Sequence, residues 1–171
     1  MSGGRSMARS ANRRRPQGGA VAIEFAILVI PLLVLLTGAT EYGRALYYYN
    51  GLTKGVRDAV RLLSTQTPTD PGYAALVNDA TCTAVFGNTG CTGEPLAPGL
   101  TTAMVSVCDP AACPGTHALQ PTGTGVVNLV TVTLGAAAPY RFTSMAPFMP
   151  AIFGVPSFNF APISVTMRQM L

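Results

Sequence analysis

The chain has one long apolar run near its N-terminus, and the sequence after it is more polar. Between Phe25 and Thr40 there is no charged residue, and Leu, Ile, Val and Ala dominate. A helix that crosses a bilayer needs about 20 apolar residues, so this helix has to begin near Ala20. Because Glu41 closes the run, the pattern predicts a transmembrane helix over residues 20–41.

The helical pattern continues past Glu41 with apolar residues on one face only. Spacings of three and four define this face, which comprises Leu46, Tyr49, Leu52, Val56, Val60 and Leu63. Charged side chains lie opposite, at Arg44, Lys54, Arg57, Asp58 and Arg61. We therefore expect an amphipathic continuation over residues 42–65, packed against an outer domain.

The rest of the chain, residues 66–171, is expected to form one small outer domain of helix and strand. Turn-forming residues occupy positions 65–72 and separate it from the long helix. The expected elements are a helix over 73–85 and strands over 101–108, 125–134 and 157–167, the last interrupted at Pro162. Residues 135–154 are apolar and rich in proline, which predicts a loop.

Positive charge is concentrated at the N-terminus. The chain has 11 Lys and Arg against 7 Asp and Glu, and five of the arginines precede Gly19. By the positive-inside rule, this basic leader, residues 1–19, stays in the cytoplasm and the sequence after Glu41 faces outward. The remaining cations are scattered and do not interleave with aromatic residues, so no nucleic-acid partner is expected.

Glu24 places a carboxylate inside the apolar run, where an unpaired charge costs about 3 kcal/mol. A cut between Gly19 and Ala20 would create an ammonium group four residues before Glu24. That amine could neutralise Glu24 within one helix, at i,i+4 spacing, or from the helix of a neighbouring subunit. In the second case Glu24 serves assembly. The alternative is that Glu24 lies at the membrane interface, within reach of headgroups and water.

The N-terminal sequence resembles a known family. Residues 15–36, RPQGGAVAIEFAILVIPLLVLL, followed by EYGRALY at 41–47, resemble the TadE-like pseudopilins of tight-adherence (Tad) pilus systems, specifically across residues 15–63. The resemblance implies that a prepilin peptidase, an aspartic protease in the membrane, cuts after Gly19. Ala20 would then begin the mature chain, and Glu24 and Phe25 would serve assembly.

The resemblance also implies a fold, a role and a location. The implied fold is α+β and pilin-like, with a long N-terminal transmembrane and amphipathic helix packed on a small antiparallel sheet with Gly/Pro-rich, disulfide-stapled loops. The implied role is that of a non-enzymatic minor pseudopilin in the initiation of a Tad-type (type IVc) adherence pilus. Implied partners are the membrane, the prepilin peptidase, a sister pseudopilin, the Flp major pilin and the inner-membrane assembly platform. The chain would be a single-pass protein of the bacterial inner membrane with its C-terminal domain outside.

All of the cysteines lie in the part expected outside, where an oxidising compartment favours disulfides. They are Cys82, Cys91, Cys108 and Cys113. The local pairs, Cys82 with Cys91 and Cys108 with Cys113, would each staple a loop, but three connectivities are open. The alternative is that the cysteines bind a metal. Few ligands are available for it, because His117 is the one histidine and there is no Cys-x-x-Cys motif. Neither a metal nor a cofactor is expected.

An enzyme is not expected either. The sequence lacks a convergent set of His, carboxylate and nucleophile, a Gly-rich phosphate loop and a G-x-S-x-G motif. The alternative function is a secreted or membrane-anchored extracytoplasmic binding domain, with an ordinary signal peptide cut before Thr40 or with an uncut signal anchor. A carboxylate such as Glu24 is unfavourable in the apolar core of a signal peptide. An uncut anchor, in turn, does not explain why Glu24 and the paired glycines occur together.

Overall fold

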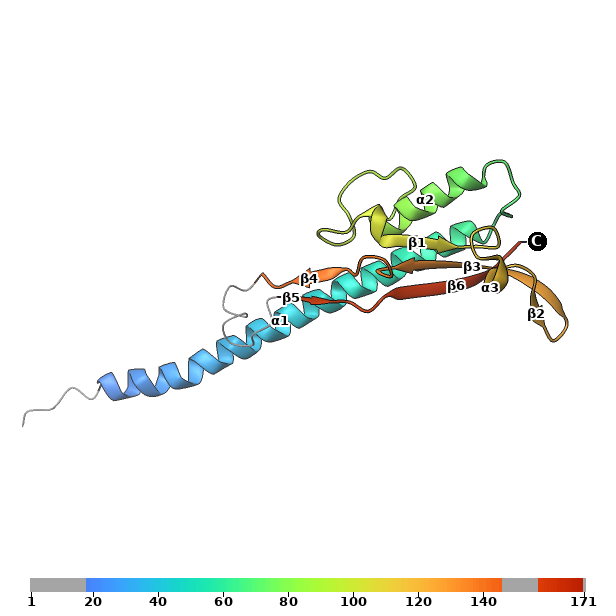
Figure 1. The fold of residues 1–171 in the computed structure, drawn as a ribbon. Helices are drawn as coiled ribbons and strands as arrows, with labels where there is room; N and C mark the ends of the chain where they lie inside the picture. Colours follow the sequence, from blue (N-terminus) through green and yellow to red (C-terminus); the bar gives the residue numbers. More distant parts are fainter. Residues whose placement is uncertain (1–17, 146–156, 171) are drawn as a thin grey trace, which may run out of the picture. The chain divides into compact units, whose positions relative to one another are not determined.

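The computed structural model describes residues 18–145 and 157–170, which divide into two units with the boundary between Gly38 and Ala39. The expected α+β class is confirmed by one long N-terminal helix, small antiparallel sheets and two disulfides (Figure 1). The long helix, α1 (Gly18–Leu63), contributes residues to both units. Residues 1–17 of the expected basic leader lie outside the described residues.

In the first unit, α1 exposes its apolar side chains. Large apolar residues that are more than half exposed there are Val21, Ile23, Phe25, Ile27, Leu28, Ile30, Leu32, Leu33, Leu35 and Leu36. Pro31 lies inside the helix and has no N–H to donate to the preceding turn. The Thr37 hydroxyl donates a hydrogen bond of 2.7 Å to the carbonyl oxygen of Leu33. This part of α1 therefore draws its support from its own backbone hydrogen bonds and not from a protein core.

In the second unit, α1 presents a stripe of buried side chains. Fully buried residues of this stripe are Leu52, Val56, Ala59, Val60 and Leu63, and Ala45 is 6% exposed. Leu46 and Tyr49, which the periodicity placed on this face, are 44% and 41% exposed. The start of the buried stripe is Ala45, a small residue that a search for large apolar side chains misses.

The second helix, α2 (Tyr73–Phe86), fits closely against α1 within the second unit. A Cβ atom added to Gly55 would lie 2.8 Å from the carbonyl oxygen of Ala84 and 2.7 Å from Cδ1 of Leu96. Glycine is needed here because any side chain would collide with the backbone of α2. The helix ends at Gly87, whose φ of +73° is a left-handed conformation that glycine adopts without strain.

The main sheet is antiparallel and is organised around its longest strand, β3 (Gly125–Leu134). Its partners are β1 (Val105–Cys108), β2 (Gln120–Thr122) and β6 (Ile163–Gln169). A 3₁₀ turn, η1 (Thr102–Met104), precedes β1. Side chains of β3 alternate, so Val130 and Val132 are fully buried in the core with α1, while Thr131 and Thr133 lie on the other face, where they pair with hydroxyl groups of β6.

A second, two-stranded sheet pairs β4 (Arg141–Thr143) with β5 (Ser157–Asn159). The expectation of a loop over residues 135–154 is therefore wrong at β4, and residues 146–154 lie outside the described residues. The break expected at Pro162 is found, because β5 and β6 are separate strands on either side of it. Aromatic rings hold β4 and β5 to each other and to α1, with Phe142 5.1 Å from Phe158 and 6.2 Å from Tyr48 between ring centroids.

Two disulfides close local loops in the second unit. Cys82 of α2 is bonded to Cys91, and Cys108 at the end of β1 is bonded to Cys113. Cys113 precedes a single helical turn, α3 (Pro114–His117), which the sequence did not indicate. The described residues contain no free cysteine.

Candidate processing and assembly segment

The expected processing site lies in the first turns of α1. Gly19 and Ala20 are exposed and helical, and a Cβ atom added to Gly19 would meet nothing within 4 Å. A protease therefore meets no obstruction from the described residues at this peptide bond, although it has to unwind one helical turn to bind the backbone in an extended form.

Glu24 lies one helical turn after Ala20 and is exposed. It makes no hydrogen bond or ion pair with another residue among those that the structure describes. Its neighbours Ile23 and Phe25 are 64% and 66% exposed. The segment thus presents a single carboxylate on an otherwise apolar helical surface, a combination that is stable in an apolar surrounding only when the charge finds a partner.

The surrounding helix is suited to a bilayer. Between Gly19 and Leu63, α1 contains a stretch that is long and apolar enough to cross a membrane, and none of that stretch is buried within the described chain. A soluble core helix of this composition would be covered by other elements. The exposed side chains here need lipid or neighbouring helices around them, which fits single-pass anchoring.

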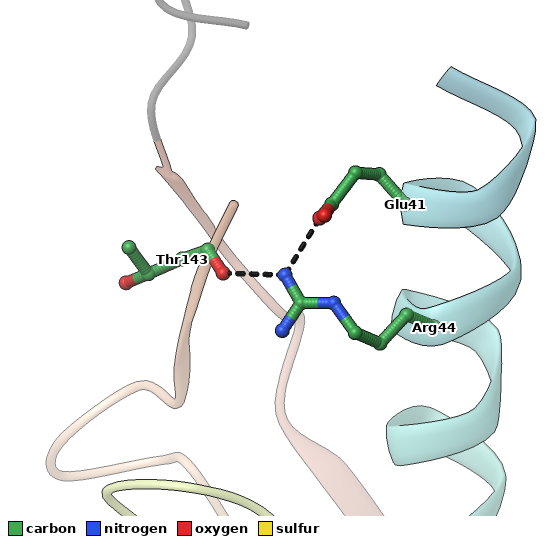
Figure 2. A network of polar contacts seen from close by, with 3 residues as sticks. All are labelled: Glu41, Arg44 and Thr143. Atoms are coloured by element: carbon green, nitrogen blue, oxygen red, sulfur yellow. Dashed lines mark hydrogen bonds and ion pairs between the residues drawn. The ribbon is translucent and has the colours of Figure 1, made fainter. Parts of the chain in front are cut away.

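The end of the apolar run carries a polar contact that the sequence did not reveal. Figure 2 shows Glu41 and Arg44 of α1 beside Thr143 of β4. Nη2 of Arg44 lies 2.6 Å from Oε2 of Glu41 and donates a second hydrogen bond, of 2.8 Å, to the carbonyl oxygen of Thr143. The Arg44 side chain is 22% exposed and that of Glu41 13% exposed. This contact ties β4 to the helix 99 residues earlier in the chain.

Aromatic rings complete the surroundings of Arg44. Its guanidinium carbon lies 4.5 Å from the ring centroid of Phe142 and 5.8 Å from that of Tyr48, both within range of a cation–π interaction. Burial lowers the pKa of Arg44, but the hydrogen bond and the charge of Glu41 outweigh it, so the pKa is raised. Arg44 is therefore a permanent cation that joins the helix to the second sheet.

Comparison with known proteins identifies the segment that contains these groups. Residues 19–61 match the model of the family described as TadE-like protein. This segment is TadE-like. The resemblance predicted from the sequence is thereby confirmed, and at the level of the family it associates the chain with Tad pili. No curated protein and no solved structure matches the chain.

The TadE-like segment includes Gly19, Glu24 and Arg44, but it ends before the disulfides and the sheets. Sequence reasoning placed Ala20, Glu24 and Phe25 correctly on one helix, which in the structure also includes Gly18 and Gly19, but it put Arg44 on the charged face without a partner in the outer domain. The partner of Arg44 is a backbone carbonyl, which every residue possesses, so no side-chain pattern could have pointed to it. The one available signal was Glu41 at i,i+3 from Arg44.

Outside the TadE-like segment, one group of side chains has metal-ligand chemistry. The ligand atoms of Cys108, Cys113 and His117 lie within 4.8 Å of one another. The two sulfur atoms are bonded to each other, however, and metal binding by cysteine requires thiolates. His117 is already engaged, with Nε2 2.8 Å from the Thr131 hydroxyl. In the folded chain this group is therefore a turn closed by the Cys108–Cys113 disulfide, and the hydrogen bond of His117 to Thr131 connects it to β3.

Proposed function

We propose that the chain is a non-enzymatic minor pseudopilin that acts in the initiation of a Tad-type adherence pilus, after a prepilin peptidase has cut it between Gly19 and Ala20. The observation that carries this proposal is Glu24, an exposed carboxylate on the apolar surface of a TadE-like helix, without a partner among the described residues. The association with Tad pili comes from the family, the cleavage and the role in initiation are what the resemblance implies, and the exposed Glu24 supports them.

The cleavage would give Glu24 the partner that it lacks. An ammonium group on Ala20 lies at i,i+4 from Glu24, where side chains on one helix face are about 5–6 Å apart. The same ammonium group on a neighbouring subunit could reach Glu24 if the two helices pack with an axial offset. Neutralisation then depends on docking in one register, because an uncompensated charge in the apolar layer costs about 3 kcal/mol.

The proposed placement follows from charge. The arginines before Gly19 hold the N-terminus in the cytoplasm, and the second unit, with both disulfides, faces the oxidising side of the bacterial inner membrane. The proposed partners are the prepilin peptidase, a sister pseudopilin, the Flp major pilin and the inner-membrane assembly platform. The proposed domain boundaries are those expected from the sequence, at residues 19, 41 and 65.

The first test is the N-terminal sequence and intact mass of the protein from its native membrane, with the prepilin peptidase active or inactivated. We expect a chain that begins at Ala20 only when the peptidase is active. Replacing Gly19 by Val should block the cut, whereas Gly18→Val, one residue further from the bond, should be cut. A chain that begins at Thr40 would overturn the proposal in favour of a secreted domain, and an uncut chain in both strains would indicate a plain anchor.

The second test addresses Glu24 itself. Glu24→Gln keeps the size of the side chain and removes the charge, so cleavage should be retained while pilus assembly is lost. Glu24→Asp keeps the charge and should restore part of the assembly. Since Glu24 touches no described residue of the second unit, neither variant should change the stability of that unit, which separates an assembly defect from misfolding.

A further inference from the structure

The end of the β4–β5 sheet at which Thr143 pairs with Ser157 lies near Glu41 and Arg44 of α1. Glu41 is the first charged residue after the uncharged stretch that ends at Thr40. Arg44, which holds the carbonyl of Thr143, is three residues further, about 4.5 Å along the helix axis. If α1 crosses a bilayer as proposed above, Thr143 therefore lies at the depth of the headgroups, which extend about 5–7 Å beyond the hydrocarbon.

The contacts of β4 and β5 also fix the direction of the strands. Phe160, which follows β5, packs on Tyr49 with ring centroids 5.6 Å apart, while Phe142 packs on Tyr48 and Thr143 is bound by Arg44. Along β4 the helix partners thus move to lower residue numbers. From Phe142 to Thr143, β4 accordingly runs toward the part of α1 that contains Glu41 and Arg44.

The side chains at this level are suited to a membrane surface. Met145 is 77% exposed, and Tyr42, the residue after Glu41 on α1, is 67% exposed. Tyrosine is enriched where a protein crosses the interface, because its ring is apolar and its hydroxyl is polar.

We propose that the second unit rests on the outer surface of the bilayer through this end of the β4–β5 sheet, with Met145 and Tyr42 in the interfacial layer. The partner is the phospholipid surface itself. This contact would be a second attachment besides the transmembrane helix, and it would orient the outer domain before the subunit joins a pilus. The inference rests on the proposed membrane crossing by α1.

The absence of tryptophan from the chain makes the test direct. Met145→Trp, in the full-length chain reconstituted into phosphatidylcholine vesicles, gives a single fluorophore at the proposed contact. Met170→Trp is the matched control, because Met170 is also an exposed methionine, at 61%, and its N–H bonds to Ser64 at the far end of α1. Leu28→Trp, at a 71% exposed position inside the apolar run, reports the membrane crossing through quenching by lipids brominated near the ends of their acyl chains.

We expect the Met145→Trp emission to lie at shorter wavelength than that of Met170→Trp. Lipids brominated near the headgroup should quench most of the Met145→Trp emission and leave the Met170→Trp emission unchanged. Phe158→Trp, 45% exposed on β5, is a second reporter and should be quenched less than Met145→Trp. Met145, Met170 and Leu28 are more than half exposed, so these three substitutions should leave the core intact, whereas Phe158 also packs on Phe142 and its variant has to be checked for folding.

Each other outcome has a distinct meaning. If Leu28→Trp is quenched and Met145→Trp is not, the membrane crossing stands and the surface contact is wrong. If Leu28→Trp is not quenched, the membrane crossing fails, and the proposed function fails with it. If Met145→Trp emits at short wavelength only at high protein-to-lipid ratio and is not quenched by brominated lipid, a second protein copy covers this end, which overturns the lipid contact.

Discussion

The two parts of α1 share one helical conformation and differ in what determines it. In the first unit the large side chains, such as Leu28 at 71% exposure, touch little of the described chain. In the second unit Leu52 and Val56 are fully buried against α2 and the sheet. The difference shows that the first part is shaped for partners outside the chain, whereas the second part belongs to a core that the chain supplies itself.

The largest expected effect comes from matched leucines in the two parts. Leu52→Ala removes a fully buried side chain and should lower the free energy of unfolding of the second unit by about 2–5 kcal/mol. Leu28→Ala should leave it unchanged, because Leu28 is outside that core. Urea titration of the full-length chain in detergent micelles, followed by circular dichroism, measures both. Equal losses for the two variants would mean that the two parts of α1 unfold as one core.

A smaller loss is expected when a disulfide of the second unit is removed. Replacing Cys82 and Cys91 together by Ala should cost about 2–4 kcal/mol, because the bond restricts the unfolded chain. The matched pair, Cys108 and Cys113, closes a separation of 5 residues instead of 9, so its removal should cost less. The same titration measures both double variants under non-reducing conditions. A larger loss for the shorter loop would contradict the loop-length argument.

The polar contact at the boundary of the apolar run should have a somewhat smaller effect. Arg44→Ala removes the hydrogen bond to Thr143 and leaves Glu41 unpaired, at a cost of about 1.5–3 kcal/mol. Arg57→Ala, on an exposed part of the same helix, is the control and should have little effect on the free energy of unfolding. Arg44→Lys should fall between the two, since Lys keeps the charge but loses the planar group over Phe142. Equal stability of Arg44→Ala and wild type would show that this contact does not hold β4 to α1.

These differences explain what could be predicted from the sequence. Glu24 and Gly19 could be found because their signal is local, a carboxylate and a glycine pair at fixed places in an apolar run. Residues 125–134 could be assigned as a strand because one face is buried, so that Val130 and Val132 alternate with threonines.

The short strand β4 could not be predicted, since its three residues are too few for their alternation to stand out from the surrounding apolar sequence. Its conformation depends on pairing with β5 and on the ring contacts of Phe142 with Tyr48. The contact of Arg44 with Thr143 depends on the same tertiary pairing. In general, local signals located the candidate assembly segment, while the packing of distant segments determined how β4 and β5 are held to α1.

The smallest effect at neutral pH concerns Tyr73, where α2 meets the end of β6. Burial raises the pKa of Tyr73 to about 12. The phenol oxygen also accepts a 2.8 Å hydrogen bond from Nε2 of Gln169, and this bond acts in the opposite direction, lowering the pKa. The same Nε2 also donates to the carbonyl of Leu63, at 3.3 Å, so Tyr73→Phe does not leave it unpaired. At pH 7 this variant should therefore lose only about 1 kcal/mol.

At alkaline pH, the free energy of unfolding should distinguish Tyr73→Phe from wild type more clearly than at pH 7. Its folded pKa lies above the ordinary value of 10.0, so the folded chain prefers the protonated phenol. The resulting stability is present below pH 10 and is lost as the pH rises toward about 12. Tyr73→Phe should show a shallower fall of the free energy of unfolding over this interval. Some fall should remain, because burial also raises the pKa of Tyr140. Identical alkaline slopes for Tyr73→Phe and wild type would mean that Tyr73 is reached by water in the folded chain, and that the second unit is open where α2 meets β6.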